Sequence, residues 1–161
     1  MHQSTQMALD TQQVEIIGRN LLLSCCIADG VEVAQPMRDR GIDIIIFNDI
    51  TEREFFLSLP VQLKASSSRS FSINSKYARI PNLLMAYVWF SNDPVNAELY
   101  IMRYSDALSI GERLGWLNTR SWVEGGAYST QSPSKQVTKE LEPFAYSIGK
   151  INNLLLSFKQ A

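Results

Sequence analysis

The fold of this chain is decided by the stretch GIDIIIFNDITEREFFLSLPVQLKAS, which occupies positions 41–66. It opens with a β-branched and aromatic run at positions 44–47, which is typical of a strand covered on both faces and so predicts a central strand. It closes with residues 60–66, where apolar and polar side chains alternate as they do in a strand with one buried face. The stretch therefore predicts two neighbouring strands of one sheet.

Both predicted strands carry polar residues that a plain core strand does not need. Asp43 stands at the mouth of the first strand, where an acid is costly unless it is paired or bound to a metal. In the second strand, Gln62 and Lys64 share a face because they are two residues apart. If the strands pair, a carboxylate, an amide oxygen and an ammonium group meet at one place. The alternative is a simple Asp43–Lys64 ion pair at a sheet edge.

This arrangement resembles the motif of the PD-(D/E)XK, or restriction endonuclease-like, nuclease superfamily: an Asp on one strand, then an acid or amide, one spacer and a Lys on the next. The resemblance covers roughly residues 12–70, because segment 12–29 is similar to the family's first helix, which often carries a Glu, here Glu15. One position departs from the usual pattern, since Gln62 stands where Asp or Glu is usual. Some members of the superfamily do carry Gln there.

The resemblance implies an α/β fold with a restriction endonuclease-like mixed central sheet flanked by helices. It implies a Mg²⁺-dependent endonuclease, restriction-like or homing-type, that hydrolyses DNA phosphodiester bonds, with Mn²⁺ as a substitute cation. The catalytic residues implied are Glu15, Asp43, Gln62 and Lys64. The metal ligands implied are Asp43, the Gln62 amide oxygen, the carbonyl of Leu63 and, through water, Glu15. Lys64 would orient the attacking water or offset charge on the phosphate.

Each implied role has a plainer alternative. Glu15 is equally an ordinary solvated acid in the first turn of a helix, where it favours the helix dipole. Because Gln62 is neutral, we expect weak metal binding in the free protein, so that substrate phosphate completes the site. With few acids nearby, the Lys64 ammonium can turn toward Asp43.

Basic and hydroxyl side chains flank the two strands, where they could contact a nucleic-acid backbone. These candidate contacts are Arg38, Arg40, Ser66, Arg69, Lys76 and Arg79. The alternative is that the arginines and lysine are ordinary solvated charges and that residues 66–70 form a flexible polar loop.

Length and composition limit the classes of protein that remain. A chain of 161 residues predicts one domain, residues 11–161, preceded by a flexible tail at residues 1–10. The net charge of −1 excludes a uniformly basic nucleic-acid binder but not a local basic patch. No apolar run approaches the ~20 residues of a membrane helix, and the polar N-terminus favours the cytoplasm. A single His argues against Ser-His or Cys-His catalysis, and adjacent Cys25 and Cys26 predict reduced core residues.

The rest of the chain alternates between strand and helix signals. The expected elements are a helix at 12–28, strands at 31–35, 54–59 and 71–74, a basic turn at 76–79, a hairpin of 83–90 with 97–104 and a helix from Ser105 or Asp106 to Leu114. An irregular segment follows at 116–129, with a turn at Gly125 and Gly126 between short strands. Pro143 either kinks the last helix or marks its true beginning. Pro60 predicts a bulge or an edge position just before Gln62.

The oligomeric state and the alternative functions follow from the same features. A DNA duplex has two strands and the chain has one candidate site, so we expect a homodimer. The alternative to a nuclease is a catalytically inactive nucleic-acid-binding or protein-interaction domain on the same fold, which the neutral Gln62 favours.

Overall fold

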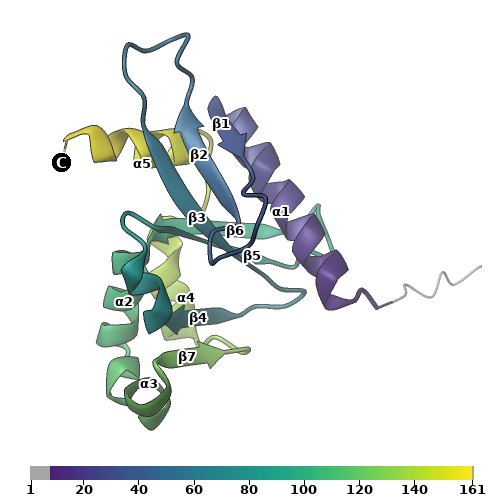
Figure 1. The fold of residues 1–161 in the computed structure, drawn as a ribbon. Helices are drawn as coiled ribbons and strands as arrows, with labels where there is room; N and C mark the ends of the chain where they lie inside the picture. The colour runs from purple at the N-terminus through teal and green to yellow at the C-terminus, as the bar shows by residue number, and fades with distance from the viewer. Residues whose placement is uncertain (1–7, 161) are drawn as a thin grey trace, which may run out of the picture.

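A mixed sheet of five strands forms the centre of the molecule, which is described by a computed structural model for residues 8–160 (Figure 1). The strand order is β1 (Val31–Ala34), β2 (Ile44–Asn48), β3 (Ser58–Ala65), β5 (Leu84–Trp89) and β6 (Glu98–Arg103). β3 and β5 run parallel, and the other neighbours are antiparallel. The predicted α/β class and mixed sheet are therefore confirmed.

Helices flank the sheet on both faces. One face carries α1 (Thr11–Ala28) and α5 (Lys150–Ser157) over an aliphatic core. The opposite face carries α2 (Tyr104–Arg113), α4 (Lys135–Leu141) and a second, two-stranded sheet of β4 (Phe71–Asn74) and β7 (Ala127–Thr130). The core on this face is rich in aromatic rings, including Phe71, Tyr87, Trp89 and Trp116. The connection from β3 to its parallel neighbour β5 runs through β4, so the small sheet is tied to the centre of the large one.

Helix α1 forms because its sequence supplies both an N-terminal cap and a stripe of buried residues at helical spacing. Asp10 caps the N-terminus, and its carboxylate accepts a hydrogen bond from the Gln13 amide at 2.8 Å. Residues spaced four apart, Val14, Gly18, Leu22 and Cys26, form the buried stripe that packs on the sheet. The helix prediction for residues 12–28 is confirmed. Most of the tail predicted at residues 1–10 lies outside the described residues, and so does His2.

Asp29, at the C-terminal end of α1, connects this helix to α5. Its carboxylate accepts hydrogen bonds from the backbone amides of Gly149 and Ile151, both at 2.7 Å, and from the Tyr146 hydroxyl at 2.9 Å. Because α1 and α5 are thereby held together, the helical layer keeps a fixed position on the sheet. Cys25 and Cys26 are free thiols in this layer, as predicted.

The β2–β3 hairpin pairs as the sequence predicted, with Ile44 opposite Val61 and Phe47 opposite Ser58. Buried Asn48 closes its loop by donating to the Phe55 carbonyl at 2.7 Å and accepting from the Leu57 amide at 2.5 Å. β3 begins at Ser58 rather than at residue 54, because this closed loop occupies the residues before it.

Two expectations for the hairpin are wrong. Ile45 and Phe47 are only half-buried, so β2 is covered fully on one face and not on both. The reason is that the aromatic core is built on β5 and β6 and includes no residue of β2. Pro60 does not form a bulge, since the β2–β3 register continues through it with Ile45 opposite Pro60. The ladder with β5 begins only at Val61, so Pro60 lies just before the residues that pair on that side.

The second half of the chain differs from expectation mainly in its short helices. α2 begins at Tyr104, and the Asp106 carboxylate accepts from the Arg103 amide instead of capping from outside the helix. The segment predicted to be irregular contains the 3₁₀ turn η2 (Trp116–Asn118) and α3 (Arg120–Gly125) before β7. The predicted last helix is two helices, because the 3₁₀ turn η3 (Glu142–Phe144), with Pro143 in it, separates α4 from α5.

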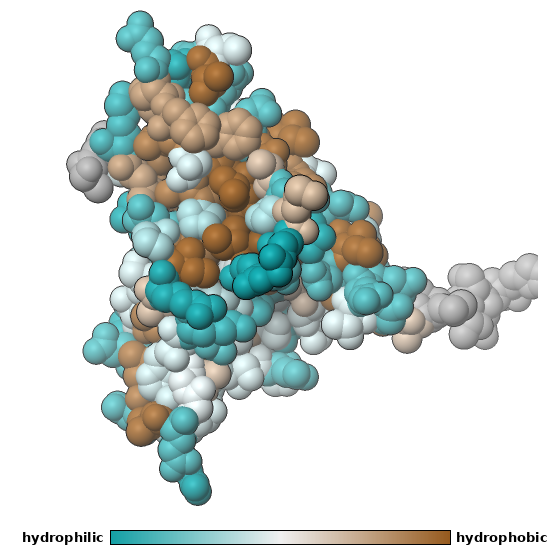
Figure 2. Space-filling view, in the orientation of Figure 1, coloured by the Kyte–Doolittle hydropathy of each residue, from teal (hydrophilic) through white to brown (hydrophobic). Residues whose placement is uncertain are grey.

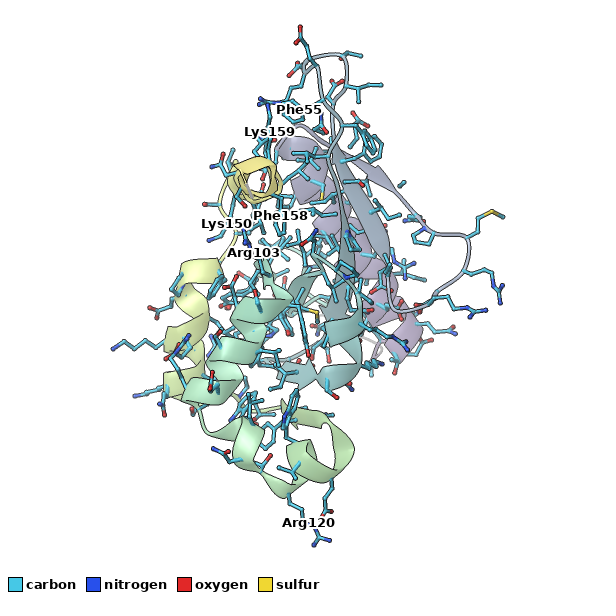
Figure 3. The ribbon with its side chains drawn as sticks, turned by 60° about the vertical axis from the view of Figure 1, so that its left-hand side comes forward. Phe55, Arg103, Arg120, Lys150, Phe158 and Lys159 are labelled. Carbon is cyan, nitrogen blue, oxygen red and sulfur yellow. The ribbon has the colours of Figure 1, made fainter. Side chains whose placement is uncertain are left out.

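Cations on aromatic rings hold the C-terminal end against the sheet. Lys159, on the 3₁₀ turn η4 (Phe158–Gln160), lies 3.6 Å from the ring centre of Phe55 in the β2–β3 loop, and Arg103 lies 4.2 Å from that of Phe158. Figure 3 shows Phe55 and Lys159 toward one end of the molecule, Arg103 nearer the middle, and Arg120 of α3 projecting from the other end. None of the described helices is long and apolar enough to cross a membrane.

Candidate active site

Asp43 lies just before β2, at the point where β3 continues beyond its partner strand. Its amide donates to the Val61 carbonyl at 2.9 Å, and its Oδ2 accepts from the Leu63 amide at 2.6 Å. The carboxylate therefore extends the strand ladder by one hydrogen bond past the end of β2. These two contacts with the backbone of β3 help fix the position of the side chain.

Gln62 meets Asp43 across the two strands and is almost fully buried, with 7% of its surface exposed. Its Nε2 donates to Asp43 Oδ2 at 2.5 Å and to the carbonyl oxygen of Leu63 at 3.1 Å. One donor group therefore lies between two acceptor oxygens. Three of the four groups that the resemblance implied as metal ligands, all except Glu15, are brought together by the β2–β3 pairing.

Burial governs the charge state of Asp43. Removal of the carboxyl group from water raises its pKa above the usual Asp value, and the negative charges of Asp39 and Glu15 act in the same direction. The hydrogen bond from the Leu63 amide and the positive charge of Arg19 act in the opposite direction but are outweighed. A cation at this carboxylate would relieve the same electrostatic cost.

Glu15 reaches the surroundings of Asp43 from α1 but does not touch it. Its Oε1 accepts from Arg19 Nη2 at 2.6 Å, one helical turn away, and half of its side chain is exposed. Within residues 8–160, the buried Nε atom of Arg19 forms no hydrogen bond. The sequence analysis missed Arg19, although its spacing of four residues from Glu15 on the same helix was a usable signal.

Lys64 does not form the ion pair with Asp43 that was one alternative. Its ammonium nitrogen lies 5.5 Å from the ring centre of Tyr77, and within the described chain no carboxylate lies within 4.0 Å of it. It still shares the polar face of β3 with Gln62, since Val61 and Leu63 belong to the aliphatic core on the other face. The Lys64 side chain therefore leaves β3 on the same face as Gln62, and its ammonium lies near Tyr77 of η1 (Ser75–Arg79).

The candidate nucleic-acid contacts divide into two groups. Arg38 and Arg40 are exposed on the loop that leads into Asp43, and Lys76 and Arg79 are exposed on η1. Gly41 connects these two segments: it has a φ of +90°, and a Cβ on it would lie 3.6 Å from Ile80, directly after η1. The two segments that carry these four basic side chains therefore adjoin at Gly41, two residues before Asp43.

Ser66 and Arg69 belong to a different part of the surface. The Ser66 carbonyl accepts from both the amide and the hydroxyl of Ser91, beyond the C-terminal end of β5. Arg69 lies 3.6 Å from a carboxylate oxygen of Glu98 and 6.0 Å from the ring centre of Trp89. These contacts occupy Arg69 and leave it outside the group around Asp43.

The oxygen atoms at Asp43 suit Mg²⁺, a hard cation that is commonly held by one or two carboxylates together with water and substrate phosphate. Residues 8–160 contain no group of three or more acids, histidines or cysteines placed to hold a metal, so one carboxylate would act alone. The Asp43 carboxylate and the Leu63 carbonyl already point at one donor, Gln62 Nε2. Rotation of that amide would present Oε1 there instead, and the residues then fit the cation.

Comparisons with known protein families, curated proteins and solved structures found no match to this chain. What the site does is therefore inferred from its residues and their geometry.

Proposed function

We propose that this chain is a Mg²⁺-dependent endonuclease of the restriction endonuclease-like type that hydrolyses phosphodiester bonds in DNA. The observation that carries the proposal is the convergence of the Asp43 carboxylate, the Gln62 amide and the Leu63 carbonyl, with Lys64 on the same face of β3. Arg38 and Arg40 on the adjoining loop supply positive charge for a polynucleotide.

The side chains divide the work of hydrolysis between them. Asp43, the Leu63 carbonyl and a rotated Gln62 amide would hold Mg²⁺, which supplies charge neutralisation on the phosphate and activation of water. Lys64 donates a hydrogen bond to the attacking water or to a phosphate oxygen, and this contact strengthens as charge develops. Arg19 places a positive charge near Asp43 that keeps its carboxyl group more readily ionised.

A homodimer forms part of the proposal, because one candidate site per chain cuts one strand of a duplex. Two copies related by a two-fold axis place two sites on the two strands. Light scattering during size-exclusion chromatography measures the mass of the protein in solution. A homodimer with two sites should have twice the mass of one chain.

The test of the proposal is cleavage of supercoiled plasmid by pure protein with Mg²⁺ and, separately, with EDTA. We expect cutting only with Mg²⁺, and strong loss of cutting in the Asp43→Asn and Lys64→Gln variants. Lys159→Gln is the matched control, since it removes one positive charge beside Phe55 at the end of the molecule opposite α3 (Figure 3). Cutting that survives both site variants would falsify the assignment.

A second function, nucleic-acid binding without catalysis, is favoured by one specific observation. Gln62 Nε2 already satisfies both Asp43 and the Leu63 carbonyl, so the site is complete without a cation. Under this alternative, the wild-type protein binds DNA in a salt-dependent way and does not cut it with Mg²⁺. The Gln62→Glu variant separates the two functions: a second carboxylate beside Asp43 would introduce cutting into an inactive protein.

A further inference from the structure

A polar pocket of about 260 Å³ shares Lys64 with the candidate active site, and the rest of its lining has no role in the chemistry described so far. It is enclosed by the end of β3, the small sheet of β4 and β7, η1 and the start of α3. Figure 2 shows side chains of mostly intermediate hydropathy over β7 and α3, whereas more apolar side chains gather over the β2–β3 hairpin. The lining includes two lysines and several small polar residues, and no acid.

The two lysines line the same pocket and lie close to one buried aromatic ring. Lys64 and Lys76 place their ammonium nitrogens 5.5 Å and 5.0 Å from the ring centre of Tyr77, which is 3% exposed. Within residues 8–160, neither ammonium has a carboxylate within 4.0 Å. Two like charges that share a pocket without an acid repel each other, and an anion placed between them would remove that repulsion.

The small sheet adds hydrogen-bonding groups to the same pocket. Ser72 and Ser129 are directly opposite each other in the β4–β7 ladder, so their side chains leave the sheet on the same face. Phe71 and Ile73, on the other face of β4, are buried in the aromatic core and fix the orientation of the strand. Hydroxyl groups beside ammonium groups are the usual partners of phosphate oxygens.

Lys64 connects this pocket to the candidate active site. It stands two residues beyond Gln62 on the same face of β3, which corresponds to about 7 Å along a strand. A polynucleotide whose reacting phosphate lies at Asp43 and Gln62 would therefore bring its next phosphate toward Lys64 and Lys76.

We propose that this pocket binds a second phosphate group of the nucleic-acid strand, next to the phosphate that is hydrolysed at Asp43. The proposal rests on the proposed function. The same phosphate chemistry has two sources, an internal phosphodiester or a terminal 5′-phosphate, which the experiment below distinguishes.

The first measurement is the melting temperature of the metal-free protein in EDTA, with inorganic phosphate or with chloride at equal ionic strength. We expect phosphate to stabilise the wild type, Asp43→Asn and the control Lys159→Gln equally. Lys76→Gln should lose most of this stabilisation, and Lys76→Arg should retain it. Because Lys76 is exposed, its variants are expected to fold, which their melting in chloride verifies. Equal phosphate stabilisation of Lys76→Gln and wild type would overturn the proposal.

The second measurement uses fluorescence anisotropy with single-stranded oligonucleotides of one sequence, with and without a 5′-phosphate, in EDTA. Log affinity falls as log salt rises, and Lys76→Gln should lower the magnitude of this slope by about 1. Loss on both oligonucleotides indicates an internal phosphate, and loss only on the phosphorylated one indicates a terminal phosphate. No loss on either contradicts the proposal. Since none of these steps requires cutting, an uncut plasmid with intact Lys76-dependent binding rejects the nuclease and not the pocket.

Discussion

At the scale of single residues, the proposed function would give Asp43 two roles that make opposite demands. As the acceptor for the Leu63 amide it completes the ladder beyond β2, and for this role a neutral oxygen is sufficient. As a ligand for a cation it must be ionised, and burial makes ionisation costly. In the metal-free protein, the neutral Gln62 amide donates a hydrogen bond to the same Oδ2 atom. It therefore stabilises the buried carboxyl group without adding charge.

The Asp43→Asn variant tests this conflict through the pH dependence of stability. A carboxyl group whose pKa is raised in the folded state supports folding fully below its unfolded pKa, about 3.9, and loses that support as pH rises through the folded pKa. Asn keeps an acceptor oxygen and never ionises. In EDTA at neutral pH, the variant should therefore melt at a higher temperature than the wild type.

Melting curves measured from pH 3 upward check this prediction. The difference in melting temperature between Asp43→Asn and the wild type should vanish at the acid end of the series. Added Mg²⁺ should raise the melting temperature of the wild type and leave that of Asp43→Asn nearly unchanged. A variant that is less stable than the wild type at neutral pH would show that the charged carboxylate, and not its burial, dominates at this position.

At the scale of elements, the contact of α1 with the end of β3 sets the position of the helix beside the site. A Cβ on Gly18 would lie 2.5 Å from the Cβ of Ala65, which follows Lys64 directly. Because that atom is fixed to the β3 backbone, the helix itself would have to move. Glu15 and Arg19, on either side of Gly18, act on Asp43 through their charges and would move with it.

We therefore expect Gly18→Ala to destabilise the protein by about 1–3 kcal/mol through overpacking, although Ala is intrinsically the better helix former. Gly125→Ala is the matched control, since a Cβ at that helical position meets nothing within 4 Å. Urea unfolding should show no loss, or a gain of up to about 1 kcal/mol, for this control. Equal effects of the two substitutions would contradict the assigned helix–strand contact.

The elements that the sequence predicts well are those whose own residues determine them. The four-residue spacing of α1 and the antiparallel hairpin of β5 and β6 are both evident in the pattern of apolar residues. α3 is not, because its six residues depend on the Thr119 cap and on packing against β7. The break between α4 and α5 is signalled by Pro143, but its position depends on the contact of Asp29 with the start of α5.

The candidate site likewise has features that the local sequence determines and features that depend on distant parts of the chain. Alternation along β3 and pairing with β2 are enough to predict that Asp43 and Gln62 meet. The direction of Lys64 could not be predicted, because it depends on Tyr77 in a segment that reaches β3 only through the fold of β4 and η1. The orientation of the Gln62 amide likewise depends on the Leu63 carbonyl oxygen, which a pattern of side chains does not reveal.

At the scale of the whole molecule, the near-neutral net charge of −1 confines any nucleic-acid contact to one region of the surface. The basic side chains on that region are Arg38, Arg40, Lys64, Lys76 and Arg79. If all of them neutralise phosphates of duplex DNA, log affinity should fall with log salt with a slope of about −4 to −5.

Anisotropy titrations of a labelled duplex in EDTA, at several concentrations of potassium chloride, measure this slope. Arg38→Gln should lower its magnitude by about 1. A slope close to zero, or one that the Arg38 substitution leaves unchanged, would place the DNA on another surface.

The central claim, that Asp43, Gln62 and the Leu63 carbonyl form a cation site, is tested most directly by the anomalous diffraction of Mn²⁺ in crystals of the protein grown with a short DNA duplex. We predict an anomalous peak within coordination distance of an Asp43 carboxylate oxygen and the Leu63 carbonyl, with the Gln62 amide rotated so that Oε1 faces the ion. A Gln62 Nε2 that still donates to both Asp43 and Leu63 at saturating Mn²⁺, with no peak beside them, would contradict the claim.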